Sequence, residues 1–135
     1  MLLRMLTGLL LLGSLAGCDW NAKPENCARF HTGHFRFQRF EPFRYAARID
    51  RNDSIQTETD ELTGAVSKLA VRWTNDCHYE LHFISSTRQL PDSIQQYRKA
   101  RPLQTEIIQA TDRYYLFTSF REKGGLALTD TMWVR

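Results

Sequence analysis

The residues that could do chemistry in this chain include two histidines and a glutamate at alternate positions: His78, Glu80 and His82. A β-strand would place all three on one face, because successive side chains point to opposite sides of a sheet. Two imidazoles and a carboxylate are competent ligands for zinc or copper. The intervening residues are aromatic or aliphatic and claim the other face for the core, so the polar face is expected to point to water. We therefore predict no metal ion and no other cofactor, and these three residues are the candidate ligands if a metal does bind.

The second reactive feature is Cys18, the first of three cysteines. It follows a segment with Arg4 near its start, an apolar run over residues 6–12 and then small residues, which is the layout of a secretory signal peptide. The apolar run is too short for a permanent membrane span. Residues 15–18, Leu-Ala-Gly-Cys, look like a bacterial lipobox, in which the cysteine thiol receives diacylglycerol and the chain is cut just before it. We predict a lipoprotein signal peptide over residues 1–17 and lipidation of Cys18.

The lipid predicts where the protein resides. Acyl chains on Cys18 would hold it firmly to a bacterial membrane, because more than one chain is attached. Residues 18–26 are polar, contain one proline and are predicted to form a short tether. The expected location is therefore the cell envelope, on the periplasmic or the surface side, with the choice between inner and outer membrane open.

Cys27 and Cys77 remain after the predicted lipidation, and export places both in an oxidising compartment. Two remaining thiols make an even set, so the simplest prediction is one disulfide between them. It would close a loop of about fifty residues and contribute about 4 kcal/mol in the chain-entropy model. The alternative is a metal-binding or redox pair, but the sequence contains neither a CxxC nor a CxxxC spacing.

Other chemistry finds little support in the sequence. No serine lies in a GxSxG motif and no cysteine stays free once the pair closes, so we predict that the protein is not an enzyme. Eighteen Lys and Arg against 15 Asp and Glu give a net charge of +3, which is too even a balance for electrostatic capture of nucleic acid. The one tight basic group, Arg98, Lys99 and Arg101, is expected to complement the end of a short helix, with contact to anionic lipid headgroups as the alternative.

These residues must be positioned by β-strands, in one domain over residues 27–135. Pro91 and Pro102 bracket the one predicted helix, and Arg51 is assigned to a turn with the two residues after it. About eight strands with tight turns and one apolar face each predict an all-β, antiparallel up-and-down barrel, and a two-sheet β-sandwich is the alternative. The alternating segments fall at residues 35–38, 45–50, 55–60, 68–73, 77–83, 103–110, 114–120 and 126–134.

Two phenylalanines fall where no strand is expected. Phe40 and Phe43 flank Pro42, at which the first strand should break, so both are expected to be exposed. An exposed aromatic pair at the mouth of a barrel could gate a ligand or meet a partner.

Two resemblances bear on this prediction. Thr32-Gly33-His34-Phe35 looks like the Gly-x-aromatic start of lipocalin-like barrels. The segments Cys27-x2-Phe30, Thr32-Gly33-x-Phe35-x-Phe37, Arg51-Asn52-Asp53-Ser54-Ile55-Gln56 and Trp73-x2-Asp76-Cys77-x-Tyr79-Glu80-Leu81 are similar to a group of small Bacteroidota lipoproteins, some of which are named topoisomerase IV. An exported chain of this length has no room for DNA cleavage and strand passage. The resemblance implies that Cys27 and Cys77 form a matched pair, and it brings no catalytic residues.

Three functions remain open at this point. The barrel could bind a small apolar or amphipathic ligand, as barrels of eight strands can. It could instead be filled by its own side chains and serve as an envelope structural or interaction protein whose outer surface meets a partner. A metal-binding protein is the third alternative. A cavity lined by apolar groups and a few polar ones would favour the first, and a packed interior with an exposed aromatic patch would favour the second.

Overall fold

The computed structural model describes residues 24–135. The predicted signal peptide, the predicted lipidation site Cys18 and most of the predicted tether lie outside the described residues. Within residues 24–135, no helix combines the length and the apolar character that a membrane-crossing helix needs.

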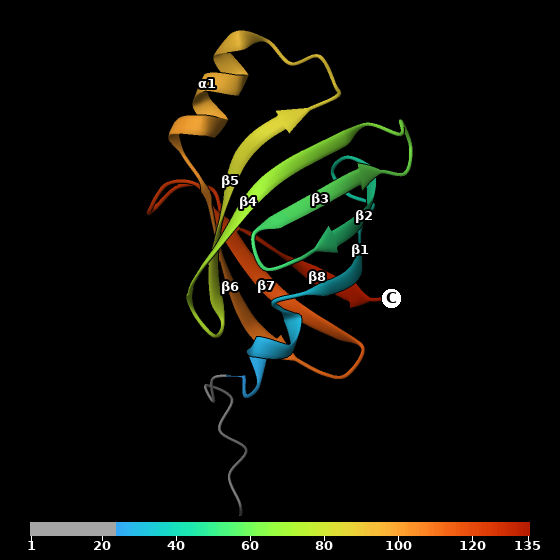
Figure 1. The fold of residues 1–135 in the computed structure, drawn as a ribbon, viewed down its shortest axis with the longest axis vertical. Coiled ribbons are helices and arrows are strands. Elements are labelled where there is room, and N and C mark those ends of the chain that lie inside the picture. Colours follow the sequence, from blue (N-terminus) through green and yellow to red (C-terminus); the bar gives the residue numbers. More distant parts are fainter. Residues whose placement is uncertain (1–23) are drawn as a thin grey trace, which may run out of the picture.

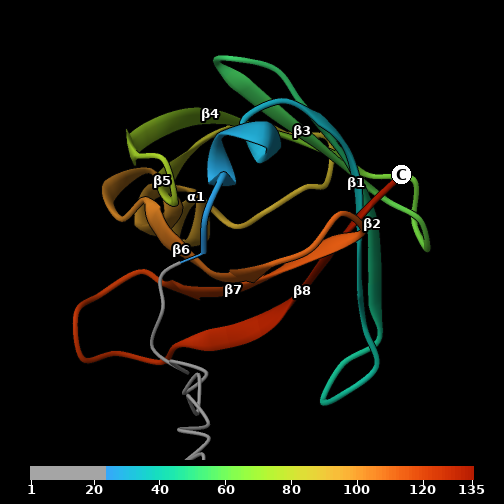
Figure 2. The ribbon, with the colours of Figure 1, turned by 90° about the horizontal axis from the view of Figure 1, so that it is seen from below.

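Eight antiparallel strands form one closed barrel in which each strand pairs with its neighbours in the sequence, and β1 pairs with β8 to close the ring. The predicted up-and-down barrel is confirmed, and the β-sandwich alternative is wrong. Figures 1 and 2 show the strands surrounding a common interior. The elements are η1 (Cys27–Phe30), β1 (Gly33–Arg39), β2 (Tyr45–Arg51), β3 (Ile55–Asp60), β4 (Val66–Asn75), β5 (His78–Ser86), α1 (Asp92–Ala100), β6 (Leu103–Ala110), β7 (Tyr114–Phe120) and β8 (Leu128–Val134).

The barrel has two different ends, which lie at the bottom and the top of Figure 1. The closed end carries η1 and the short turns β2–β3, β4–β5 and β6–β7. The open end carries α1 and the longer connections 40–44, 61–65, 87–91 and 121–127. The fold therefore places tight turns at one end and longer connections at the other.

Side-chain hydrogen bonds explain why the turns at the closed end are short. The Asn52 carboxamide oxygen accepts the backbone N–H groups of Ser54 and Ile55 at 3.0 and 2.8 Å. The Asn75 carboxamide oxygen accepts those of Cys77 and His78, both at 2.9 Å. Asparagine is favoured in turns because its side chain can bond the backbone two and three residues ahead in this way.

Gly33 opens β1 at a position where a side chain would not fit. Its φ is 139°, a backbone conformation that residues with a Cβ rarely adopt. A Cβ at this position would also lie 3.2 Å from Cζ of the Phe35 ring, which covers the glycine. The Gly-x-aromatic start of the first strand thus has a packing reason.

The helix begins and ends where the prolines predict. Pro91 precedes α1 at its N-cap, and the chain after Ala100 turns into β6 at Pro102. Arg98 and Lys99 occupy the last turn, as predicted, where positive charge complements the helix dipole. No residue of α1 is fully buried, and the helix packs on β5 at the open end.

Residue pairing shows which side chains point into the barrel. Ile49 of β2 is buried in the core and pairs with Glu58, while Arg51 pairs with Gln56. Paired residues share a face, so β3 turns its polar side chains inward. The expectation of an apolar inner face is wrong for β3, and the assignment of Arg51 to a turn is wrong, because Arg51 ends β2 and is 4% exposed.

Strand β8 differs from its predicted start. It begins at Leu128 rather than Leu126. Leu126 belongs to the β7–β8 connection at the open end and is 96% exposed.

The closed half of the barrel is solid. The ring of Phe30 from η1 lies 4.9 Å from that of Tyr115, and Phe35 packs edge-on to Tyr115 at 5.9 Å. Trp73 and Tyr79 pack beside them with ring centroids 4.5 Å apart. Aromatic pairs at these separations contribute beyond the area that they bury. This cluster of rings is therefore the main core of the molecule, and η1 covers it from below.

Candidate functional site

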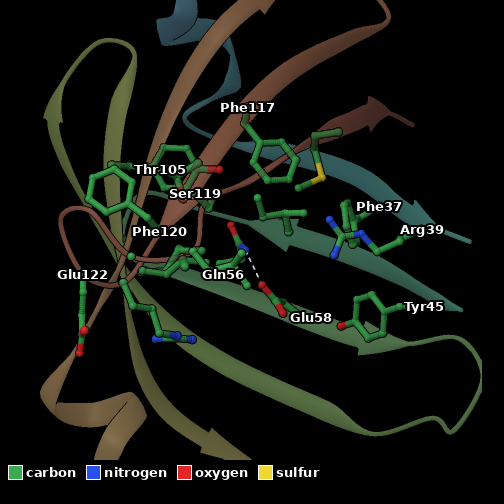
Figure 3. Close-up of a pocket in the computed structure, with 18 of the residues that line it drawn as sticks. Phe37, Arg39, Tyr45, Gln56, Glu58, Thr105, Phe117, Ser119, Phe120 and Glu122 are labelled. Carbon is green, nitrogen blue, oxygen red and sulfur yellow. Dashed lines mark hydrogen bonds between the residues drawn. The ribbon is translucent and has the colours of Figure 1, made fainter. Parts of the chain in front are cut away.

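The open half of the barrel contains a pocket of about 570 Å³, which we call the lumen pocket. Its volume lies in the range of small-molecule sites, which are mostly apolar with a few polar groups. Figure 3 shows its side chains projecting from several strands toward a shared space. Its apolar lining includes Phe37, Leu81, Leu103, Phe117, Leu128 and Met132, and its polar lining includes Arg39, Tyr45, Gln56, Glu58, Thr105, Ser119 and Arg121.

A second pocket of about 250 Å³, the side pocket, adjoins the first, and Arg98 of α1 is part of its lining. Tyr45, Glu58, Leu103 and Arg121 line both pockets, so the two are adjacent. The side pocket is more polar, because Asp60, Ser67, Ser86, Arg88 and Arg98 also line it.

A chain of hydrogen bonds links the solid half of the barrel to the lumen pocket. The Arg51 Nε donates to the Gln56 carboxamide oxygen at 2.7 Å, and the Gln56 Nε2 donates to the Glu58 carboxylate, also at 2.7 Å. Gln56 is only 1% exposed, so its orientation is fixed by these two partners. Figure 3 shows Gln56 and Glu58 side by side on β3 with this bond between them.

Arg51 makes three further hydrogen bonds at the closed end of the barrel. Its Nη1 donates to the Phe30 carbonyl at 2.9 Å, and its Nη2 donates to the hydroxyls of Tyr79 and Tyr115 at 3.2 and 3.1 Å. The guanidinium also lies over the Tyr79 ring, 4.6 Å from its centroid. A buried arginine needs this many partners, because an unpaired buried charge is very costly.

Glu58 is the ionisable end of the chain. Burial raises the pKa of its carboxyl, and the hydrogen bond from Gln56 and the positive charges of Arg51, Arg98 and Arg121 oppose that rise. None of the ion pairs within residues 24–135 includes Glu58. The Glu58 carboxyl group thus lines both pockets without a cation in direct contact.

Thr105, Ser119 and Arg39, which also line the lumen pocket, have protein partners. The hydroxyls of Thr105 and Ser119 bond each other at 2.8 Å, which satisfies both within the barrel wall. The Arg39 Nε bonds the Asp130 carboxylate at 3.2 Å. These pairs shape the wall and leave Glu58 and Arg121 as the charged groups that both pockets share.

The structure places His78, Glu80 and His82 on the outer face of β5, as predicted from the alternation. They do not gather around one point. His82 Nε2 lies 2.9 Å from the Glu80 carboxylate, and that bond lowers the pKa of Glu80, while His78 Nε2 lies 3.2 Å from Glu106 on β6. Within residues 24–135, no three His, Cys, Asp or Glu side chains are grouped so that they could hold a metal ion.

Cys27 and Cys77 form a disulfide, with a Cα–Cα distance of 5.1 Å, so the predicted pairing agrees with the structure. The bond ties η1 to the turn between β4 and β5 at the closed end. Both sulfur atoms are therefore structural and lie in the solid half of the barrel, away from the lumen pocket.

The predicted exposure of Phe40 and Phe43 is confirmed at 65% and 80%. Both lie in the β1–β2 connection at the open end. Leu126, in the β7–β8 connection, lines the lumen pocket and is exposed as well. Leu126 thus places an exposed apolar side chain at the lumen pocket, whereas Phe40 and Phe43 line neither pocket.

Sequence reasoning missed Gln56 and Glu58, although a signal was present. Asn52 pairs with Ile55 across a two-residue turn at residues 53–54, and this register places Ile49 opposite Glu58, on the same face of the sheet. An apolar residue in the core then requires that its polar partner also points inward.

The comparisons with known proteins give no further lead. No protein-family model, no curated protein and no solved structure matches this chain.

Proposed function

We propose that this protein is a membrane-anchored binding module that holds a small, mostly apolar ligand inside its barrel. The observation that carries the proposal is the division of the barrel interior. The closed half is filled by aromatic side chains, whereas the open half holds the lumen pocket of about 570 Å³. A barrel with no use for a ligand would gain stability by filling that space, because unfilled apolar volume forfeits packing energy.

The amino-terminal features fit this role. A lipid on Cys18 would keep the module at a bacterial membrane, on the periplasmic or the surface side of the cell envelope. The proposed anchor and the binding function are separate claims, and each has its own test.

A neutral fluorescent dye, N-phenyl-1-naphthylamine, tests the binding function. The exported protein carrying Cys18→Ser is titrated with the dye, whose emission rises when it enters an apolar site. Leu103 lines both pockets, so Leu103→Trp should fill the space and weaken dye binding about tenfold or more. Ile108 lies on the same strand but is exposed on its outer side, so Ile108→Trp is the matched control and should bind as the parent does.

Two results would count against the binding function. The first is a parent protein that takes up no dye. The second is dye binding that Leu103→Trp and Ile108→Trp affect equally, since that would place the dye on the surface.

A second candidate function rests on Phe40 and Phe43, whose exposure favours contact with another envelope protein. A photo-crosslinking residue at position 43 should then give one discrete adduct in intact cells. The same residue at position 108 is the control, and equal adduct patterns from the two positions would remove the support for a partner.

A further inference from the structure

The side pocket gathers arginines from three separate segments. Arg88 comes from the connection that follows β5, Arg98 from the last turn of α1, and Arg121 from the residue after β7. Residues so far apart in the sequence meet here because β5, α1 and β7 all reach the open end of the barrel.

These arginines are not neutralised by direct ion pairs. None of the ion pairs within residues 24–135 includes Arg88, Arg98 or Arg121. Arg121 uses its Nη1 to donate to the Arg101 carbonyl at 2.7 Å, and burial followed by the nearby charge of Arg98 lowers its pKa. Like charges held together in a partly buried place favour an anion that joins them.

The acidic groups of the side pocket lie near these arginines but make no direct ion pair with them within the described residues. Asp60 accepts the backbone N–H groups of Leu62 and Thr63 at 2.8 and 3.2 Å, which fixes its carboxylate in the β3–β4 turn. Glu58 is fixed by Gln56 and makes no ion pair within the described residues. A cationic group in this pocket would meet Glu58 but would be repelled by three guanidinium groups.

Resting on the proposed function, we propose that the ligand is a single-chain amphiphile with an anionic head, held with its apolar chain in the lumen pocket and its carboxylate or phosphate between Arg98 and Arg121 in the side pocket. Leu103 and Arg121 line both pockets, so a mostly apolar space and an arginine-lined space lie next to each other, as the two parts of such a ligand require. Guanidinium groups suit this head, because their planar donors bind carboxylate and phosphate in pairs.

Displacement of the neutral dye by four matched ligands tests this inference: decanoate, decyl phosphate, decanol and decylamine. They share one chain, so differences among them report the head. Decanoate or decyl phosphate should displace the dye at concentrations about tenfold lower than decanol, and decylamine should be the weakest. The better of the two anions identifies the head as a carboxylate or a phosphate.

Three variants and one control variant test where the head group binds. Arg98→Gln and Arg121→Gln should each lower the affinity for the preferred anion about tenfold and leave the affinity for decanol unchanged. Unchanged decanol binding also shows that the barrel is folded. Arg48→Gln is the control: it removes the same charge from the outer face of β2 and should change the affinity for neither ligand. Glu58→Gln should raise the affinity for the anion, because it removes the carboxylate next to the proposed head group. The same substitution would lower the affinity for a ligand with a cationic head group.

The outcomes separate this inference from the proposed function. Dye binding that Leu103→Trp abolishes, combined with equal displacement by decanoate, decyl phosphate and decanol, would keep the binding module and overturn the anionic head. Preference for decylamine, or weaker anion binding by Glu58→Gln, would also overturn it. Absence of dye binding would instead defeat the proposed function itself.

Discussion

Arg51 is the residue at which the two halves of the barrel meet. Its guanidinium bonds the Phe30 carbonyl that closes the lower end, two tyrosine hydroxyls of the core, and the Gln56 carboxamide that leads to the lumen pocket. A lysine ammonium group could not make all of these bonds, because the partners lie in several directions around the planar guanidinium. Arg51 therefore fixes both η1 and the orientation of Gln56.

Replacing Arg51 should destabilise the domain strongly. Arg51→Met would leave buried acceptors without donors, and each loss costs about 1–3 kcal/mol, so the free energy of unfolding should fall by about 3 kcal/mol or more. Arg51→Lys should recover only part of the loss. Urea unfolding followed by tryptophan fluorescence measures both variants, and a loss below about 1 kcal/mol for Arg51→Met would show that the network contributes little.

Glu58 should make the stability of the domain depend on pH. Burial raises the pKa of Glu58 in the folded state, so folding penalises its ionised form. That penalty is complete above the folded pKa and absent below the unfolded pKa of about 4.3. Glu58→Gln should therefore raise the free energy of unfolding at pH 7, and the gain should shrink as the pH falls toward about 4.

Glu61→Gln is the control, because its effect on the free energy of unfolding at pH 7 should have the opposite sign. The hydrogen bond from Arg36 lowers the pKa of Glu61, so its ionised form adds stability above the unfolded pKa and that stability is lost as the pH falls through the folded pKa. Unfolding at a series of pH values compares the two variants. A gain for Glu58→Gln that does not change with pH would contradict the role given to its charge.

At the scale of elements, the strand pattern predicted the barrel, because most strands alternate one apolar and one polar face. Strands β6 and β7 have the predicted bounds, and Tyr79, Leu81 and Phe83 of β5 face the core as expected. The pattern failed on β3, whose inner face carries Gln56 and Glu58. Hydrophobic alternation cannot find such a strand, because the site needs polar groups where the pattern expects apolar ones.

The residues that line the side pocket also could not be predicted from the sequence. Arg98 was predicted as a charge at the end of α1, and it does occupy the last turn. Its position beside Arg121 depends on how α1 packs over the end of the barrel. Periodicity predicts elements, whereas a site between elements depends on their tertiary arrangement.

The disulfide should stabilise the element that closes the barrel. It joins residues separated by 50 positions, and a loop of that length gives about 4 kcal/mol in the chain-entropy model. The double variant Cys27→Ala, Cys77→Ala should lose about that amount, measured by urea unfolding. Reduction of the parent protein is the matched control and should give a similar loss. An unchanged midpoint in both would contradict a stabilising role.

At the scale of the whole molecule, the two ends of the barrel differ in structure and in proposed role. The disulfide, η1 and the aromatic core make the closed end rigid, while the open end carries the pockets, α1 and the exposed apolar side chains of the long connections. The chain enters the barrel at Cys27, at the closed end. A lipid on Cys18 would therefore attach the molecule by its rigid end and leave the open end accessible to ligands.

That attachment can be tested directly. Cys18 and Cys27 lie nine positions apart, and an extended chain of this length spans about 30 Å, so a lipid on Cys18 would hold the barrel near the membrane. Cys18→Ser should move the protein from the membrane fraction to the soluble fraction of the envelope, and metabolic labelling with a fatty acid should be lost with it. The dye affinity of the released protein should equal that of the lipidated one, because the pocket lies at the opposite end. Membrane retention of Cys18→Ser, with the label still attached, would show that another group carries the lipid.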